Sequence, residues 1–176
     1  MNKIALITGA TSGIGQATAL KAAEAGFDII ITGRRTERLE TLAKEIRNKG
    51  VDVLTLNFDI RQAAEVTKAI DGLTGKWKEI AVLVNNAGLA VGVSPIQEGI
   101  LDDWERMIDT NIKGLLYITR AVTPLMIAHN SGHIVNLASI AGKEVYPGGN
   151  VYCATKHAVD ALSKAMRTDM LKHNIK

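Results

Sequence analysis

Residues 3–15 read KIALITGATSGIG, and this stretch decides the fold. The run from Ile4 to Ile7 is apolar, which is typical of a short buried strand. Glycines follow at positions 9, 13 and 15, and the sequence becomes helical from Gly13 onward. A strand, a glycine-rich turn and a helix in this order predict a phosphate-binding loop, because the first amides of a helix and the positive end of its dipole attract anions.

The spacing of the glycines determines how specifically this motif indicates a phosphate-binding loop. We expect Gly9 to permit a tight turn, Gly13 to let the backbone approach a pyrophosphate, and Gly15 to allow close packing of the helix on the strand. The pattern is G-x-x-x-G-x-G and not the common G-x-G-x-x-G, so the motif alone could be an ordinary turn. The loop residues expected at the cofactor are Gly9, Thr11, Ser12, Gly13, Ile14 and Gly15.

Strands and helices alternate along the rest of the chain, which favours the phosphate-loop interpretation. The expected strands are residues 3–8, 28–32, 51–57, 80–84 and 133–137. The expected helices are 13–25, 36–48, 63–73, 102–128 (its last part disturbed by Pro124) and 150–172. Several strands are apolar on both faces, so this order predicts a Rossmann-like, doubly wound parallel sheet in three αβα layers, forming a single domain over residues 1–176.

Composition excludes several classes of protein. Of the 176 residues 47% are hydrophobic and 22% charged, as expected for a globular domain. The longest apolar runs are too short for a membrane span, and the N-terminus lacks the pattern of a signal peptide. With Cys153 as its one cysteine the chain is expected in the cytoplasm, and a net charge of +3 among mixed charges predicts no nucleic-acid partner. The four histidines are scattered, so no metal site is expected.

The residues after the second strand predict which dinucleotide binds. An NAD site places a carboxylate against the ribose 2′-hydroxyl, whereas this chain has Arg34 and Arg35 there. Arginine can pair with a 2′-phosphate, so NADP is favoured over NAD, although both arginines could simply open a surface helix. Asp59 and Ile60 follow the third strand, and Asp59 could contact the adenine amino group or serve as an ordinary turn aspartate.

Three side chains near the end of the chain suggest a catalytic group. Tyr152 and Lys156 are four residues apart in an expected helix and therefore share one face. Ser139 follows the fifth strand, at the carboxyl edge where open α/β sheets bind ligands. Oxidation of an alcohol requires a base at its hydroxyl, and a phenol beside an ammonium suits that task, with a serine hydroxyl to hold the substrate oxygen. Singly, Tyr-x-x-x-Lys is a weak pattern and Ser139 could be a turn cap.

These residues together resemble the short-chain dehydrogenase/reductase family. The segments that carry the resemblance are residues 8–15, Asn85-Asn86-Ala87-Gly88, Asn111, Ser139 and Tyr152-Cys153-Ala154-Thr155-Lys156. The resemblance implies that Tyr152 is the general acid/base and that Lys156 binds the nicotinamide ribose and makes the tyrosine more acidic. It also implies that Ser139 positions the substrate, that Asn111 holds a proton-relaying water, and that Asn86, Ala87 and Gly88 line the cofactor site.

A finer resemblance is to the NADP-dependent 3-hydroxy acid (serine and allo-threonine) dehydrogenases. Residues 33–39, 108–115 and 146–152 carry it. It implies a short hydroxy acid or carbonyl compound as substrate and a homotetramer that pairs its long helices. Family members usually continue for about another half-domain, so the resemblance also implies that C-terminal strands and the substrate-closing segment are missing here, which would leave the fifth strand as an exposed edge.

Other functions remain open on the sequence. The same fold could serve as a non-catalytic NADP-binding or redox-sensing module, but such a module has no need of Ser139, Tyr152 and Lys156 together. A short-chain reductase for another carbonyl substrate fits the same residues. Sugar-nucleotide epimerases and dehydratases share Tyr-x-x-x-Lys, but their glycine spacing and length resemble this chain less.

Overall fold

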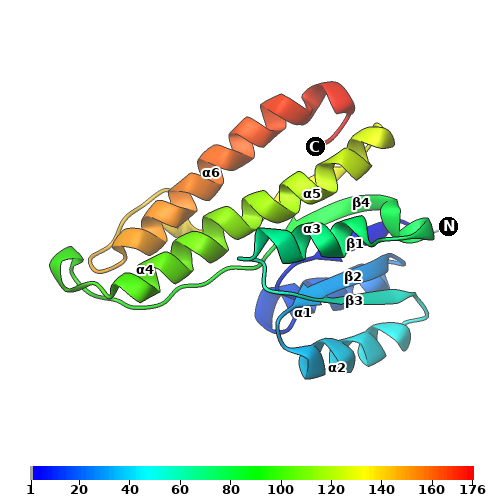
Figure 1. Ribbon diagram of the computed structural model, residues 1–176, viewed down its shortest axis with the longest axis horizontal. Coiled ribbons are helices and arrows are strands. Elements are labelled where there is room, and N and C mark those ends of the chain that lie inside the picture. Colours follow the sequence, from blue (N-terminus) through cyan, green and yellow to red (C-terminus); the bar gives the residue numbers. More distant parts are fainter. Residues whose placement is uncertain (1) are drawn as a thin grey trace.

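Five parallel strands form the central sheet in the computed structural model, which describes residues 2–176 (Figure 1). The strands are β1 (Ile4–Ile7), β2 (Asp28–Gly33), β3 (Val53–Asn57), β4 (Ile80–Asn85) and β5 (His133–Asn136). Their order across the sheet is β3-β2-β1-β4-β5, and every neighbouring pair is parallel. The predicted doubly wound parallel fold is confirmed.

Within residues 2–176, six α-helices connect the strands and cover the sheet. They are α1 (Gly13–Glu24), α2 (Thr36–Arg47), α3 (Ala63–Asp71), α4 (Leu101–Ile108), α5 (Leu115–Ala128) and α6 (Asn150–Met170). Helices α1 and α2 lie on one face, whereas α3 and α5 pack together on the other (Figure 1). Helix α6 packs across α4, and it is linked to the end of β5 by a hydrogen bond from Asn136 to Ser163. Among residues 2–176, no helix combines the length and apolarity needed to cross a membrane.

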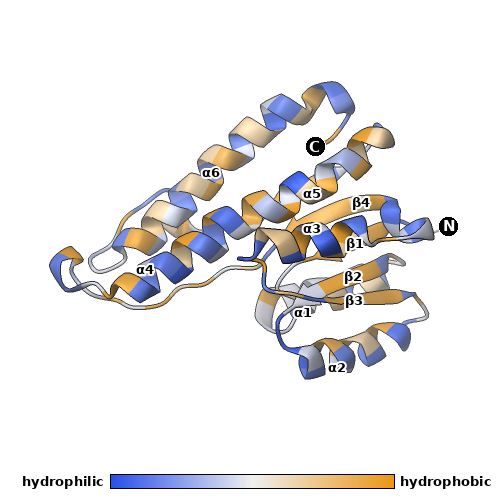
Figure 2. Cartoon of the chain, viewed as in Figure 1, coloured by the Kyte–Doolittle hydropathy of each residue, from blue (hydrophilic) through white to orange (hydrophobic). Residues whose placement is uncertain are grey.

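The sheet separates two apolar cores. Ile29 and Ile31 of β2 point toward α1 and α2, while Ile30 points toward α3 and α5, as the alternation of side chains along a strand requires. All three are fully buried. Figure 2 shows the consequence, since the strands are orange along most of their length while the helices alternate between orange and blue. The edge strand β3 is only half-buried, as its alternating sequence predicts.

The order of the strands creates a crevice beside β1. The chain leaves β1 toward β2 on one side, and β4 lies on the other side, so the connections diverge at the carboxyl ends of β1 and β4. Ligands of open α/β sheets bind at such a switch point. The glycine-rich loop, the residues after β4 and the start of α6 are therefore all at one edge of the sheet.

The predicted helical region 102–128 is confirmed in its extent, but it is not one regular α-helix. It consists of α4 and α5 joined by a π-helical turn, Asp109–Gly114. Pro124 lies inside α5, yet the helix runs through it to Ala128. The fully buried side chains of Val122 and Met126 hold this part of the helix on the sheet, which offsets the backbone hydrogen bond that proline lacks.

The outer side of β5 is partly covered by the last residues of the chain. The Ile134 amide donates to the Lys176 carbonyl at 2.7 Å, and the Lys176 amide donates to the Gly132 carbonyl at 3.0 Å. Gly132 and Ile175 form a parallel bridge. The remainder of β5 stays open, with Val135 38% exposed, so this edge is less covered than any part of β1 or β2.

Candidate active site

Two glycines of the phosphate loop, Gly9 and Gly13, have a positive φ. Gly9 has φ +63°, and a Cβ built there would lie 2.8 Å from the Cα of Ala87, so a side chain would be both strained and obstructed. Gly13 has φ +56° but faces open space. Helix α1 starts at Gly13, and the side chain of Ser12 makes no capping bond to it. The first amides of α1 therefore stay available to an anion in the cleft.

Asn86 joins the ends of β1 and β4 beneath this loop. Its side-chain amide donates to the carbonyls of Thr8 and Gly9, at 2.8 and 3.2 Å. The Thr8 hydroxyl accepts from the amides of Asn86 and Ala87, both at 3.0 Å. A Cβ on Gly15 would overlap the Asn86 amide nitrogen and lie 2.6 Å from the Gly9 carbonyl oxygen. Gly15 thus permits the close packing expected of it, and the packing partner is the Asn86 side chain.

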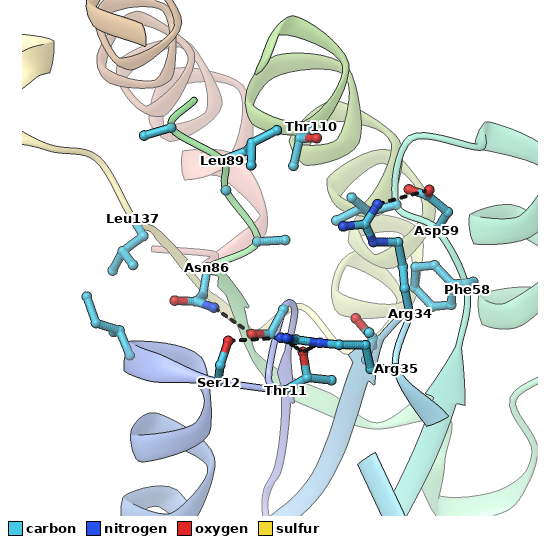
Figure 3. Close-up of a pocket in the computed structure, with 18 of the residues that line it drawn as sticks. Thr11, Ser12, Arg34, Arg35, Phe58, Asp59, Asn86, Leu89, Thr110 and Leu137 are labelled. Carbon is cyan, nitrogen blue, oxygen red and sulfur yellow. Dashed lines mark hydrogen bonds and ion pairs between the residues drawn. The ribbon is translucent and has the colours of Figure 1, made fainter. Parts of the chain in front are cut away.

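Arg35 closes the open side of the phosphate loop. Its guanidinium donates to the Thr11 hydroxyl from Nε at 3.1 Å and from Nη2 at 2.6 Å, and to the Ser12 hydroxyl at 3.0 Å (Figure 3). A guanidinium held by two hydroxyls next to a cleft is preorganised for a phosphate. Arg34 is also exposed and forms a 3.6 Å ion pair with Asp59.

Asp59 is engaged by its own turn. Its carboxylate accepts from the Arg61 guanidinium at 2.6 Å and from the Arg61 backbone amide at 3.0 Å. Burial acts to raise the pKa of Asp59, but the hydrogen bonds from Arg61 outweigh it and hold this pKa below its usual value. The sequence allowed Asp59 either to contact the adenine amino group or to serve as an ordinary turn aspartate, and this geometry favours the turn aspartate.

These parts surround a cleft of about 580 Å³. Most of the sequence-predicted cofactor residues line it, namely Gly9, Thr11, Ser12, Ile14, Arg34, Arg35, Asp59, Ile60, Asn86, Ala87, Gly88, Tyr152 and Lys156. Four predicted site residues lie outside its lining: Gly13, Gly15, Asn111 and Ser139. Eight lining residues were missed: Thr32, Gly33, Phe58, Leu89, Ala90, Thr110, Leu137 and Ala138. Most of these lie at or just after the carboxyl end of a strand, and that position was the signal that could have found them.

Tyr152 and Lys156 lie on the first turns of α6, facing this cleft. The Lys156 Nζ lies 5.9 Å from the centre of the Tyr152 ring and donates to the Leu137 carbonyl at 2.8 Å. Lys156 is 8% exposed, and this burial lowers the pKa of its ammonium group. The pair is therefore brought together as predicted, with the lysine anchored to the segment that follows β5.

Asn111 lies in the π-helical turn with its side chain fully engaged. Its Oδ1 accepts from the Leu89 amide at 2.7 Å, and its Nδ2 donates to the Leu89 carbonyl at 2.8 Å. The same Nδ2 donates to the Thr155 hydroxyl at 3.0 Å. A Cβ on Gly88 would lie 3.6 Å from the Asn111 Oδ1 and 3.7 Å from the Lys156 Nζ, so Asn111 approaches the lysine across this glycine.

Ser139 caps a short 3-10 turn, Ile140–Gly142, after β5. Its hydroxyl oxygen accepts from the Ala141 amide at 3.2 Å, which leaves the hydroxyl hydrogen free to donate. The turn packs closely on α6, since a Cβ on Gly142 would lie 2.6 Å from the Lys156 carbonyl oxygen. Ser139 is thus the turn cap that the sequence allowed, placed beside the helix of Tyr152 and Lys156.

A smaller cleft of about 160 Å³ opens on the other side of Tyr152. It lies between the loop after β4, helix α4 and the segment before α6, and Tyr152 lines both clefts. The Asn150 side chain ties two of these segments together by donating to the Ser94 carbonyl at 2.9 Å. Tyr152 therefore stands between a large cleft containing the phosphate loop and a small one without it. Within residues 2–176, no three metal-ligating side chains are grouped.

Comparison with known proteins decides the family. The family model described as "short chain dehydrogenase" matches residues 3–176. The chain belongs to the short-chain dehydrogenase family. The resemblance to this family that the sequence motifs carry is confirmed.

Individual relatives are also close. The chain is 49% identical over 167 residues to the NADP-dependent 3-hydroxy acid dehydrogenase YdfG of Salmonella typhi, covering 95% of this chain and 66% of the relative. It is 47% identical over 171 residues to sulfoacetaldehyde reductase 2 of Chromohalobacter salexigens, covering 97% of this chain and 68% of the relative. A solved structure, the closed form of serine dehydrogenase complexed with NADP+, matches with a TM-score of 0.89 and 46% identity, covering 95% of this chain and 66% of that one. The chain thus spans about two thirds of the length of these relatives.

Proposed function

We propose that the chain carries the machinery of an NADP-dependent oxidoreductase that transfers a hydride between NADP(H) and a short 3-hydroxy acid or a related secondary alcohol or ketone. The observation that carries the proposal is the position of Tyr152 and Lys156 on the wall of the same cleft that holds the phosphate loop and Arg35. The names of the relatives support both the cofactor and the class of substrate.

The residues present fit NADP(H). Gly9 leaves the phosphate loop without a side chain where Ala87 approaches. Ser12 and Ile14, at the start of α1, line the cleft, and Arg35 lies beside them with its guanidinium held for a 2′-phosphate. The cleft volume of about 580 Å³ lies in the range of cofactor sites. Residue 34, directly after β2, is an arginine where an NAD site would place a carboxylate. When bound, NADP(H) would supply the hydride chemistry.

The protein's own part is the movement and stabilisation of a proton. Tyr152 gives a proton to the substrate oxygen in reduction and removes it in oxidation. The Lys156 ammonium lies close enough to favour the negative charge that develops on the phenol oxygen. Ser139 donates its free hydroxyl hydrogen to the substrate oxygen. The Asn111 side chain is already engaged with Leu89 and Thr155. We therefore propose that the proton-relaying water expected at Asn111 binds the backbone of this residue and not its side chain.

The proposal extends to the molecule's surroundings. We include a homotetramer that pairs the long helices, which rests on the resemblance to the family. We also include a cytoplasmic location, which rests on the single cysteine and the N-terminal sequence, and a single catalytic domain, which rests on the unbroken alternation of strands and helices. A second candidate, a reductase for sulfoacetaldehyde or a similar carbonyl compound, is favoured by the relative that is 47% identical and carries that name.

Catalysis is tested with Tyr152→Phe. Wild type should form NADPH with L-serine or 3-hydroxybutyrate, or consume it with sulfoacetaldehyde, and the preferred compound assigns the substrate. Tyr152→Phe should lower kcat by at least about a hundredfold, since it removes the general acid/base, and should leave NADPH affinity within about threefold. Tyr117→Phe, on α5, is the matched control. Unchanged turnover in Tyr152→Phe would refute the mechanism, and NADPH binding by wild type without turnover of any compound would support the non-catalytic module.

Cofactor choice is tested with Arg35→Ala. NADPH affinity, measured by fluorescence, should fall about ten- to a hundredfold because a charge-assisted contact to the 2′-phosphate is lost. NADH affinity should change less than about threefold, since NADH lacks that phosphate. Arg38→Ala, an exposed arginine of α2, serves as control. Faster turnover of wild type with NAD than with NADP contradicts the role given to Arg34 and Arg35.

A further inference from the structure

Thr155 lies between Tyr152 and Lys156 in the sequence of α6 and is 1% exposed. Its hydroxyl donates to the Tyr152 carbonyl at 2.8 Å, within the helix. The same hydroxyl accepts from the Asn111 amide at 3.0 Å, across to the π-helical turn. One buried hydroxyl therefore connects the backbone of the tyrosine with the side chain of Asn111.

Asn111 extends this connection to the loop that follows β4. Its amide group bonds to both backbone groups of Leu89, directly after Gly88. Figure 3 shows Leu89 and Thr110, the neighbour of Asn111, side by side at the far end of the cleft from Arg35. Three segments distant in sequence are thus held at one point, and Thr155 is the residue by which α6 takes part.

We propose that Thr155 is a positioning residue, which holds the first turns of α6 in register with the π-helical turn and the Leu89 loop and so sets the places of Tyr152 and Lys156 for proton transfer. The proposal rests on the function proposed above. Thr155 itself lies outside the lining of both clefts beside Tyr152. It acts through its neighbours, and displacements of about 1 Å at a reacting group can reduce turnover up to a hundredfold.

A threonine in a helix often donates its hydroxyl to a backbone carbonyl of the preceding turn, as Thr155 does to Tyr152, and makes no other side-chain hydrogen bond. Thr168, also on α6, donates to the Lys164 carbonyl at 3.2 Å, and this is its one side-chain hydrogen bond among residues 2–176. Such local bonds have little effect beyond the helix. What distinguishes Thr155 is the second bond, which it receives from another element in a buried place where an unpaired amide hydrogen is costly.

The test compares three variants with wild type. Thr155→Val keeps the shape of the side chain and removes both hydrogen bonds, Thr155→Ser restores the hydroxyl, and Thr168→Val removes a local bond on the same helix. The measurements are kcat and its pH profile, the dissociation constant of NADPH, and the tyrosinate absorbance titration of Tyr152, taken as the difference between each protein and its Tyr152→Phe form.

We expect Thr155→Val to lower kcat about tenfold and to shift both its pH profile and the Tyr152 titration, because the lysine and tyrosine lose their register. NADPH affinity should stay within about threefold, and Thr155→Ser and Thr168→Val should match wild type. A Thr155→Val protein with unchanged kcat and titration overturns the proposal, as does a Thr155→Ser protein as impaired as Thr155→Val. Should Thr155→Val not fold, Thr155→Ala takes its place with the same two outcomes.

The titration separates this proposal from the one on which it rests. If wild type turns over none of the compounds offered, the proposed function fails, yet the Tyr152 titration still reports whether Thr155 sets the surroundings of the phenol. A shift of that titration in Thr155→Val that Thr155→Ser abolishes supports the positioning role, and its absence refutes it.

Discussion

The side chains of β1 and β2 are much more deeply buried than those of β5, at the edge of the sheet. In β1 and β2 the side chains are nearly inaccessible, and Ile29, Ile30 and Ile31 are fully buried. In β5 they alternate between exposed and half-buried, and Val135 is 38% exposed. The β1–β2 half of the sheet contains a complete phosphate loop within one short stretch. The site at the β5 edge instead depends on four parts of the chain, namely the Leu89 loop, the π-helical turn, the segment after β5 and α6. Buried side chains therefore hold the β1–β2 half in place, whereas the site at the β5 edge is held by a few hydrogen bonds.

Truncation of one side chain in each half should give the largest contrast. Ile30→Ala should reduce the free energy of unfolding by about 2–5 kcal/mol, because it leaves a cavity between β2 and the layer of α3 and α5. Val135→Ala should cost less than about 1 kcal/mol, since much of its side chain already contacts water. Urea denaturation followed by circular dichroism measures both. Equal losses would show that the two halves do not differ as their burial indicates.

Alanine substitutions at Gly9 and Gly13 should separate the cost of backbone strain at a positive φ from the cost of a collision with a neighbouring segment. Gly9→Ala should cost about 2–3 kcal/mol and abolish tight NADPH binding, because it combines a positive φ with a collision against Ala87. Gly13→Ala has a positive φ but open space, so about 1 kcal/mol is expected. Denaturation and NADPH fluorescence report the two effects. If Gly13→Ala proves as damaging as Gly9→Ala, the close approach to Ala87 is not what limits position 9.

The amino end of β2 offers a smaller, pH-dependent contrast. Asp28 is buried and accepts from Lys76 Nζ at 2.7 Å, from the Asp52 amide at 3.0 Å and from Asn2 at 3.2 Å. Burial acts to raise the pKa of Asp28, but these hydrogen bonds outweigh it and hold the pKa below its usual value. Asp28→Asn should therefore cost about 1 kcal/mol at pH 7.

This cost should vanish in acid. The ionised carboxylate favours the folded state above its unfolded pKa of about 3.9, and that contribution is lost as the pH falls through the lower folded pKa. Urea denaturation of wild type and Asp28→Asn should converge between about pH 4 and pH 2. Asp169→Asn, an exposed residue of α6, is the control and should show little difference at any pH. A gap for Asp28→Asn that widens in acid would contradict the direction of the pKa shift.

Local sequence was enough for the parts that are local in the structure. The alternation of apolar runs placed all five strands within two residues of their true limits, and the glycine pattern located the phosphate loop. Tyr152 and Lys156 could be paired because a helix brings residues four apart onto one face. Gly26 and Gly50 end helices with positive φ, as glycines after a helix usually do.

The parts that sequence could not place are contacts between distant segments. Nothing local in the sequence indicates that Arg35 would bond to Thr11 and Ser12, which lie more than twenty residues earlier in the chain. The π-helical turn, DTNIKG, contains one apolar residue, Ile112, and nothing in its sequence distinguishes it from the α-helical turns on either side. These features follow from tertiary packing, which only the folded chain reveals.

The π-helical turn also acts as a change of phase. A π-turn contains one residue more than the α-helical turn it replaces, and one residue corresponds to about 100° of rotation around a helix. Helices α4 and α5 are therefore offset, so Asn111 can point at α6 while Ile118 and Val122 point at the sheet. Removing one residue between 109 and 114 would make the helix regular, and one of those two faces would then turn away from its partner. The number of residues in the π-helical turn therefore matters to the site as much as the chemistry of its side chains. A deletion in this turn would disable the site even if it left Asn111, Ser139, Tyr152 and Lys156 in place.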